Sequence, residues 1–218
     1  MARIAIVGGH GKIALELSKQ LSRNGDTPVG LIRNPDHASD LERVGAESAI
    51  VDIENADVAE FARAFEGADA VVFAAGAGGD GKIERKQSVD LGGSVKSVAA
   101  ASDAGVTRFV QISAIGVDRP IAEDTEPVWK AYVEAKRDAD INLRDSDLNW
   151  TIVRPGALID DPATGDITLG DEVERGSIPR KDVAAVIVAV LAEPKTFGKQ
   201  WEVVSGTTPI DQAIAANI

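Results

Sequence analysis

A tyrosine, a lysine and a serine in the second half of the chain form a set that could carry out proton transfer. Tyr132 and Lys136 stand four residues apart in a segment with helical periodicity, and Ser113 directly follows a short apolar run. Residues four apart on a helix project from one face, so the phenol and the ammonium would lie side by side. The ammonium would lower the phenol pKa, the phenol would exchange a proton with a carbonyl or alcohol oxygen, and the serine would orient that oxygen. This spacing is typical of carbonyl–alcohol redox chemistry, although it also occurs by chance on amphipathic helices.

A glycine turn near the N-terminus points to a phosphate-containing ligand. Gly8, Gly11 and Ala14 lie at intervals of three where an apolar run passes into a helical pattern. Gly8 permits a tight turn, Gly11 lets the backbone approach a pyrophosphate, and Ala14 lets the helix pack close to the strand. The N–H groups of the helix N-terminus favour the phosphates. In this setting the turn predicts NAD(P) binding rather than an unliganded turn, through Gly8, His10, Gly11, Lys12 and Ile13.

The end of the second apolar run bears on which dinucleotide is bound. It reads Leu31-Ile32-Arg33-Asn34, with no carboxylate at its tip. A carboxylate there accepts hydrogen bonds from the ribose of NAD, whereas an arginine accommodates the 2′-phosphate of NADP. Arg33 therefore favours NADP, with Lys12 as a possible helper. NAD stays open, because Arg33 could also be an ordinary solvated side chain.

Further cofactor contacts are expected where later strands end. Asp52 and Ile53 follow the third strand, where Asp52 could reach the adenine amino group or simply serve as a loop aspartate. Ala74, Ala75 and Gly76 leave the fourth strand with side chains small enough to admit the ribose on the nicotinamide side. Small residues at that point could also serve packing alone.

The elements that must position these residues alternate between short apolar runs and longer segments with helical spacing. Strands are expected at 3–7, 27–32, 48–53, 70–74, 108–112, 150–153 and 201–204. Helices are expected from residue 13 to 23, around 38–44, and at 58–65, 87–104, 128–144 and 183–191, with a glycine-rich loop at 76–81. This alternation predicts an α/β, Rossmann-like, doubly wound parallel sheet with helices on both faces. Ligands of such sheets bind beyond the carboxyl ends of the strands.

Composition limits the alternatives. A chain of 218 residues suits one domain over 1–218, with a small substrate-side excursion at about 157–177. No cysteine and only two histidines leave no basis for a metal site. The net charge of −12 argues against nucleic-acid binding. Without a signal-peptide pattern or a membrane-length apolar stretch, we expect a cytoplasmic protein with no membrane contact.

Several motifs together resemble a known family. They are residues 6–14 (IVGGHGKIA), 89–91 (VDL), 104–106 (AGV), 108–113 (RFVQIS), 150–156 (WTIVRPG) and 178–184 (IPRKDVA). Across nearly its whole length the chain resembles the atypical short-chain dehydrogenases/reductases of the NAD(P)-binding, NmrA-like type, close to proteins labelled NAD-dependent epimerase/dehydratase. The resemblance implies a Rossmann-like fold with the residues after Pro155 closing over the nicotinamide end. It adds Pro155, Gly156, Ala157, Tyr132 and Lys136 to the expected cofactor contacts.

The leading hypothesis is an NADPH-preferring oxidoreductase that acts on a small carbonyl, quinone or flavin-like acceptor. A non-catalytic NAD(P)H-binding redox sensor is the first alternative, and a sugar epimerase/dehydratase is the second. The segment 160–176 is too short to form the larger lobe of nucleotide-sugar epimerases. The loops expected around the substrate, 77–85, 117–128 and 157–177, are rich in acids. These acids disfavour an anionic substrate if they face the pocket, but they could also simply face water. The helices around 93–104 and 128–144 could pair subunits in a homodimer.

Overall fold

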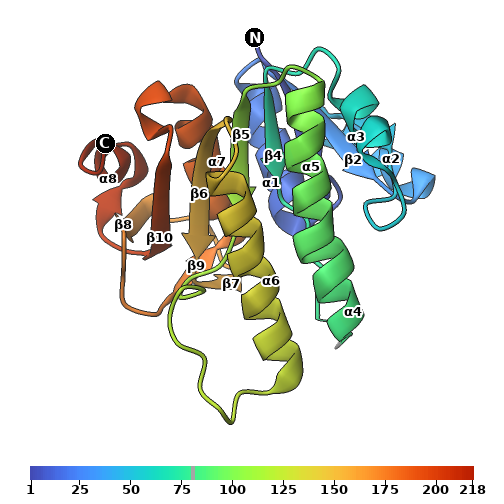
Figure 1. The fold of residues 1–218 in the computed structure, drawn as a ribbon. Helices are drawn as coiled ribbons and strands as arrows, with labels where there is room; N and C mark the ends of the chain where they lie inside the picture. The colour runs from blue at the N-terminus through green and yellow to red at the C-terminus, as the bar shows by residue number, and fades with distance from the viewer. Residues whose placement is uncertain (80–81) are drawn as a thin grey trace.

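The computed structural model describes residues 1–79 and 82–218, and within them nine strands form one sheet in the order β11-β8-β10-β6-β5-β4-β1-β2-β3 (Figure 1). The pairings within the main part of the sheet are all parallel. This confirms the predicted Rossmann-like α/β sheet. The parallel strands are β1 (Arg3–Val7), β2 (Thr27–Ile32), β3 (Glu47–Ile50), β4 (Ala70–Phe73), β5 (Arg108–Ile112), β6 (Asn149–Pro155) and β10 (Lys199–Ser205).

Helices cover both faces of this sheet and separate two apolar cores. Ile4 and Ile6 of β1 pack in one core with α1 (Lys12–Arg23) and α7 (Arg180–Ala192). The alternate residues Ala5 and Val7 pack in the other core, with α3 (Val58–Phe65), α5 (Gly92–Asp103) and α6 (Pro127–Arg144). Strand residues alternate between faces, so the central strands β1, β4, β5 and β6 contribute to both cores. Figure 1 shows α5 and α6 side by side on one face of the sheet.

The position of β1 decides where a ligand can bind. The chain passes from β1 outward to β2 and β3, and it later returns to β4 on the other side of β1. The crossovers on the two sides of β1 therefore diverge, and they leave a crevice at the carboxyl ends of β1 and β4. The glycine turn and the loop after β4 both lie at this point.

Some element boundaries differ from those predicted. The third strand ends at Ile50 rather than residue 53, because the Asp52 carboxylate and carbonyl accept hydrogen bonds from the N–H groups of Glu54 and Ala56 and close a turn. The helix expected from residue 87 is preceded by α4 (Ile83–Arg85) and starts as a π-helical stretch, η2 (Lys86–Leu91), before α5. Residues 80–81 of the predicted glycine-rich loop lie outside the described residues. Short helices complete the chain: η1 (Pro35–His37), α2 (Ala38–Arg43), η3 (Pro194–Thr196) and α8 (Ile210–Ala215).

The C-terminal third contains strands that the sequence did not predict. β8 (Asp166–Gly170) pairs antiparallel with β10, and β11 (Thr208–Pro209) pairs antiparallel with β8. β7 (Ala157–Ile159) and β9 (Ser177–Pro179) form a separate two-stranded parallel sheet. Residues 157–177 are therefore a short set of strands after β6.

Candidate active site

The glycine turn fits tightly between neighbouring strands. Gly8 adopts a φ of +81°, and a Cβ on it would lie 2.7 Å from the Ala75 Cα. A Cβ on Gly9 would lie 2.5 Å from the Gly30 Cα. Gly11 occupies the N-cap of α1 and has no side chain that could cap the helix. The first N–H groups of α1 are therefore available to an anionic group beyond the end of β1.

The first cavity lies at the carboxyl ends of β1 to β4 and measures about 440 Å³. Predicted cofactor contacts that line it are Gly8, His10, Gly11, Arg33, Asp52, Ile53, Ala74, Ala75 and Gly76. The structure thus brings together residues from four different strand ends, as the doubly wound fold requires.

Arg33 is exposed at the rim of the first cavity and is already paired. Its Nη1 lies 3.2 Å from Glu54 Oε2. Arg85 Nε lies 3.4 Å from the same carboxylate, and Ser88 donates a hydrogen bond to Glu54 Oε1. Glu54, which the sequence analysis did not single out, is therefore neutralised by two guanidinium groups. An anionic ligand group at this rim would compete with Glu54 for Arg33.

The two histidines of the chain meet at the same rim. Their rings stack with centroids 3.6 Å apart, and His10 Nε2 lies 2.7 Å from Asp40 Oδ2. The hydrogen bond from His10 lowers the pKa of the Asp40 carboxyl, which burial only partly offsets. His10 was predicted as a cofactor contact, whereas His37 was not. The sequence signal for His37 was its position shortly after the carboxyl end of β2, in η1.

Asp52 is used mainly within its own turn. Its carboxylate accepts hydrogen bonds from the Glu54 N–H at 3.1 Å and from Asn55 Nδ2 at 2.8 Å. Burial raises the pKa of Asp52, but these hydrogen bonds outweigh that effect and hold it below its usual range. Contact with an adenine amino group stays a prediction.

The second cavity is larger, about 890 Å³, and adjoins the first. The two cavities share Gly11, Ala74, Ala75 and Gly76 as lining residues. All the other predicted site residues line the second cavity, namely Lys12, Ile13, Ser113, Tyr132, Lys136, Pro155, Gly156 and Ala157. A ligand that extends past the shared residues would therefore pass from the Arg33 rim to the Tyr132–Lys136 face of α6.

Tyr132 and Lys136 lie on the wall of the second cavity in different electrostatic settings. Burial raises the pKa of the Tyr132 phenol, and the nearby Lys136 charge lowers it by less. The expected net lowering by Lys136 is therefore wrong, because the loss of water around the phenol dominates. The phenol is protonated at neutral pH.

Lys136 is buried and held from three directions. Its Nζ lies 3.4 Å from Asp90 Oδ1 and donates hydrogen bonds to the carbonyl oxygens of Ile112 at 3.2 Å and Ala75 at 3.5 Å. Asp90 in turn accepts a hydrogen bond from the Ala77 N–H at 3.0 Å. Asp90 lies in the π-helical stretch η2, and such stretches often occur at functional sites. The sequence analysis quoted Asp90 only within a family motif and assigned it no role.

Ser113 takes part in a buried network beneath the cavity. Its Oγ donates a hydrogen bond to Asp140 Oδ2 at 2.8 Å. Asp140 also accepts hydrogen bonds from Gln111 Nε2 at 2.6 Å and Arg154 Nε at 2.9 Å. The Ser113 hydroxyl proton is thus directed at Asp140, and its oxygen can still accept a hydrogen bond. The predicted orienting role of Ser113 requires the hydroxyl to rotate toward a substrate.

The acidic residues expected around the substrate do not form the cavity wall. Among the acids of 117–128 and 157–177, Glu126 alone lines it, and its carboxylate caps α6 by accepting hydrogen bonds from the Val128 and Trp129 N–H groups. The Asp118 carboxylate lies 2.7 Å from Arg154 Nη1, and Asp160 pairs with Lys12 and Arg180. Asp118 and Asp160 are therefore directed at basic partners.

Comparison with known families gives the ligand class. A family model described as NAD(P)H-binding matches residues 8–194. The chain belongs to this NAD(P)H-binding family. The match begins at Gly8 in the glycine turn and includes both cavities.

Relatives cover the whole chain of this NAD(P)H-binding protein. A Bacillus subtilis protein named as an uncharacterized sugar epimerase is 34% identical, over 97% of this chain and 98% of its own. A solved structure from Bacillus halodurans, provisionally named an NAD-dependent epimerase/dehydratase, has a TM-score of 0.92 and 35% identity over 99% of this chain and 100% of its own. An oxidoreductase structure from Lactococcus lactis has a TM-score of 0.87 and 30% identity over 98% and 95% of the two chains.

The residues of this NAD(P)H-binding protein fit such a dinucleotide. A backbone without side chains at Gly8 and Gly11 leaves room for a pyrophosphate, and the joined cavities match an elongated ligand. In the part of the chain that the structure describes, no group of three or more potential ligand side chains is arranged to hold a metal ion. Within the same residues, no helix is both long and apolar enough to cross a membrane.

Proposed function

We propose that the chain is an NADPH-dependent oxidoreductase that reduces a small carbonyl, quinone or flavin-like acceptor in the second cavity. The observation that carries this proposal is the pairing of Tyr132 and Lys136 on the wall of a cavity that shares Ala74 to Gly76 with the dinucleotide side. A nicotinamide ring that passed the shared residues would enter the space in front of the phenol. The oxidoreductase name of the Lactococcus lactis relative agrees with this proposal.

The proposed reaction assigns separate roles to the two side chains. Bound NADPH would supply the hydride that the carbonyl carbon takes up, with NADP⁺ as its product. The carbonyl oxygen takes its proton from the Tyr132 phenol, which is protonated at neutral pH because burial raises its pKa. The Lys136 ammonium, fixed by Asp90, stabilises the resulting phenolate until a proton from water restores the phenol.

Each of the two alternatives makes a prediction about the second cavity. A non-catalytic sensor would gain support if Tyr132 and Lys136 were enclosed in the core away from the dinucleotide, but both line the second cavity. The Bacillus subtilis relative is named a sugar epimerase. An epimerase that acts on nucleotide-sugars would need a larger substrate lobe. The segment between β6 and α7 contributes only β7, β8 and β9. Reduction of a small acceptor fits this enclosure better.

The preference for NADPH rests on Arg33. We expect NADPH to bind at least about tenfold more tightly than NADH, because a 2′-phosphate gains a charge-assisted contact with Arg33. Arg33→Ser should remove most of this difference and change NADH binding little. Arg63→Ser, an exposed arginine on α3, serves as the control. Fluorescence titration with both cofactors measures the effect, and tighter binding of NADH would contradict the preference.

Turnover is tested separately from binding. NADPH oxidation at 340 nm is followed with quinones, flavins and aldehydes as acceptors. Oxidation that requires an acceptor supports the oxidoreductase. Tight NADPH binding without oxidation of NADPH by any acceptor class would favour the sensor, and interconversion of sugar epimers without net NADPH consumption would favour the epimerase.

A further inference from the structure

The charges on the second cavity wall do not all cancel. Lys136 faces Asp90, while Lys12 and Arg180 both contact Asp160 at 2.6 Å. Glu126 is occupied in capping α6. Two further cations on this wall, Lys86 and Arg175, form no ion pair with any residue that the structure describes.

Lys86 is the more informative of the two cations, because it is only 5% exposed. It lies in the π-helical stretch η2, and its Nζ donates a hydrogen bond to the Gly78 carbonyl oxygen. The same Nζ lies 5.8 Å from the centroid of the Tyr132 ring. Burial of an ammonium group without a counter-charge is costly, so such a group is usually matched by an anion. Here that anion would lie beside the proposed proton donor.

Arg175 lies in the loop between β8 and β9, far along the sequence from Lys86, and it lines the same cavity. The segment that carries it is fixed by Glu202, which accepts hydrogen bonds from the Val173 N–H at 3.0 Å and the Gly116 N–H at 2.7 Å. The exposed Arg175 therefore extends from a loop whose backbone is held in place by these hydrogen bonds. A planar guanidinium suits carboxylate and phosphate oxygens.

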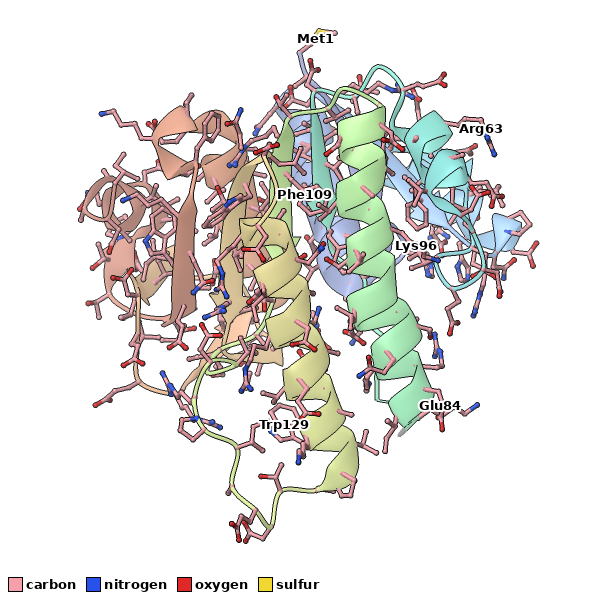
Figure 2. The ribbon with its side chains drawn as sticks, in the orientation of Figure 1. Met1, Arg63, Glu84, Lys96, Phe109 and Trp129 are labelled. Carbon is pink, nitrogen blue, oxygen red and sulfur yellow. The ribbon has the colours of Figure 1, made fainter. Side chains whose placement is uncertain are left out.

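An aromatic surface lies at the same cavity. Trp129 is 52% exposed, and its ring centroid lies 5.2 Å from that of Tyr132. Figure 2 shows Trp129 on the first turns of α6, at the end of the molecule where the loops after the strands gather. Leu158 adds an exposed apolar side chain to the wall. An exposed tryptophan beside a buried phenol offers a flat, apolar contact for an unsaturated ring.

We propose that the acceptor is an anion, with a flat unsaturated ring placed against Trp129 and a carboxylate or phosphate group bound by Lys86 and Arg175. This inference rests on the proposed function and names the substrate class of that site. It replaces the expectation that an anionic substrate is disfavoured. The two cations would select the charged group, while Tyr132 and Lys136 would act on the ring carbonyl or its conjugated equivalent.

Matched acceptor pairs test the inference. FMN and riboflavin share a ring and differ in a phosphate, whereas 4-carboxybenzaldehyde and its methyl ester differ in a carboxylate. With the native protein, kcat/KM should be at least about tenfold higher for the charged member of a pair that is reduced. In Lys86→Met combined with Arg175→Gln, this ratio should fall to near one. Lys19→Met combined with Arg63→Gln, which changes exposed cations that line neither cavity, should keep it.

Binding keeps the inference separate from turnover. Quenching of tryptophan fluorescence measures the dissociation constants of FMN and riboflavin in the NADP⁺ complex even if neither is reduced. We expect FMN to bind more tightly, and the difference to disappear in the double variant. Equal binding of the two, no binding of FMN, or a preference that survives in the double variant would overturn the proposal. A loss of NADPH affinity in the double variant with unchanged acceptor preference would assign the cations to the cofactor instead.

Discussion

Tyr132 lies where burial and a neighbouring charge act on one phenol in opposite directions. Burial prevails and raises the phenol pKa above its ordinary value, so the acid form persists through neutral and mildly alkaline pH. Because a proton donor loses activity as pH rises through its pKa, we expect kcat for reduction to stay level up to about pH 9 and to fall only above that.

The matching variant removes only the hydroxyl. Tyr132→Phe should lower kcat by about 100-fold or more, since a positioned general acid contributes on that order. The dissociation constant for NADPH should change far less. Stopped-flow measurement of NADPH oxidation across pH gives both results, and a variant with unaltered turnover would remove the proton-donor role.

Individual residues differ in how far the sequence could place them. Gly8 and Gly11 were predictable because turn geometry limits the residue type at each position. The hydrogen bond from Ser113 to Asp140 was not, since it joins the end of β5 to α6 and depends on tertiary packing. Lys86 carried no sequence signal at all, because only the folded chain shows that it is buried with no carboxylate partner among the residues that the structure describes.

At the scale of elements, Glu202 of β10 holds two loops against the second cavity. Besides the N–H groups of Gly116 and Val173, it accepts a hydrogen bond from Arg119 Nη2 at 2.7 Å, and it is 3% exposed. Glu202→Gln replaces one accepting oxygen by a donor that would face another donor. We expect the free energy of unfolding to fall by about 2 kcal/mol, with a decrease in Tm of about 4–8 °C.

The same change separates the two cavities functionally. We expect the KM for the acceptor to rise with Glu202→Gln, whereas NADPH affinity stays near its native value, because the loops fixed by Glu202 border only the second cavity. Glu42→Gln, on the exposed side of α2, is the control. Thermal melts and steady-state kinetics measure the effects. A variant with native Tm and native KM would show that Glu202 is not needed to hold these two loops in place.

Elements with a strong apolar pattern were located well from sequence, and the others were not. The buried parallel strands are short apolar runs, so the sequence located the middle of each strand even where one end differed by a few residues. β8 and β11 contain polar and turn-forming residues, and their strand geometry comes from pairing with β10 and with each other. The π-helical stretch η2 likewise depends on contacts that no local pattern describes, including that of Asp90 with Lys136.

At the scale of the molecule, one sheet with a core on each face should respond to the cofactor as a unit. A ligand that binds only the folded state at about 100 times its dissociation constant adds about 2.7 kcal/mol to the free energy of unfolding. For a chain of this length that corresponds to a rise in Tm of about 5–11 °C. Thermal unfolding with and without NADPH measures it. The rise should shrink with Arg33→Ser, and an unchanged Tm at saturating NADPH would contradict dinucleotide binding.

The molecule as a whole is negatively charged, whereas the second cavity is lined by two cations without an ion-pair partner among the described residues. The net charge of −12 predicts that nucleic acid is disfavoured as a partner class, and the acidic loops predict the same for an anionic substrate, whereas the proposed acceptor is an anion. Charge totals average over the whole surface, whereas a cavity wall depends on which side chains the fold directs inward. Only the folded chain reveals that Lys86 and Arg175 line the same cavity.

The wall shared by the two cavities also has a consequence for the order of events. Gly11, Ala74, Ala75 and Gly76 belong to both cavities, so a dinucleotide laid across them would form part of the surface on which the acceptor rests. An acceptor that arrived first would find that surface incomplete and would obstruct the way in. We therefore expect an ordered sequence of binding in which the dinucleotide enters first and leaves last, with the reduced acceptor released in between.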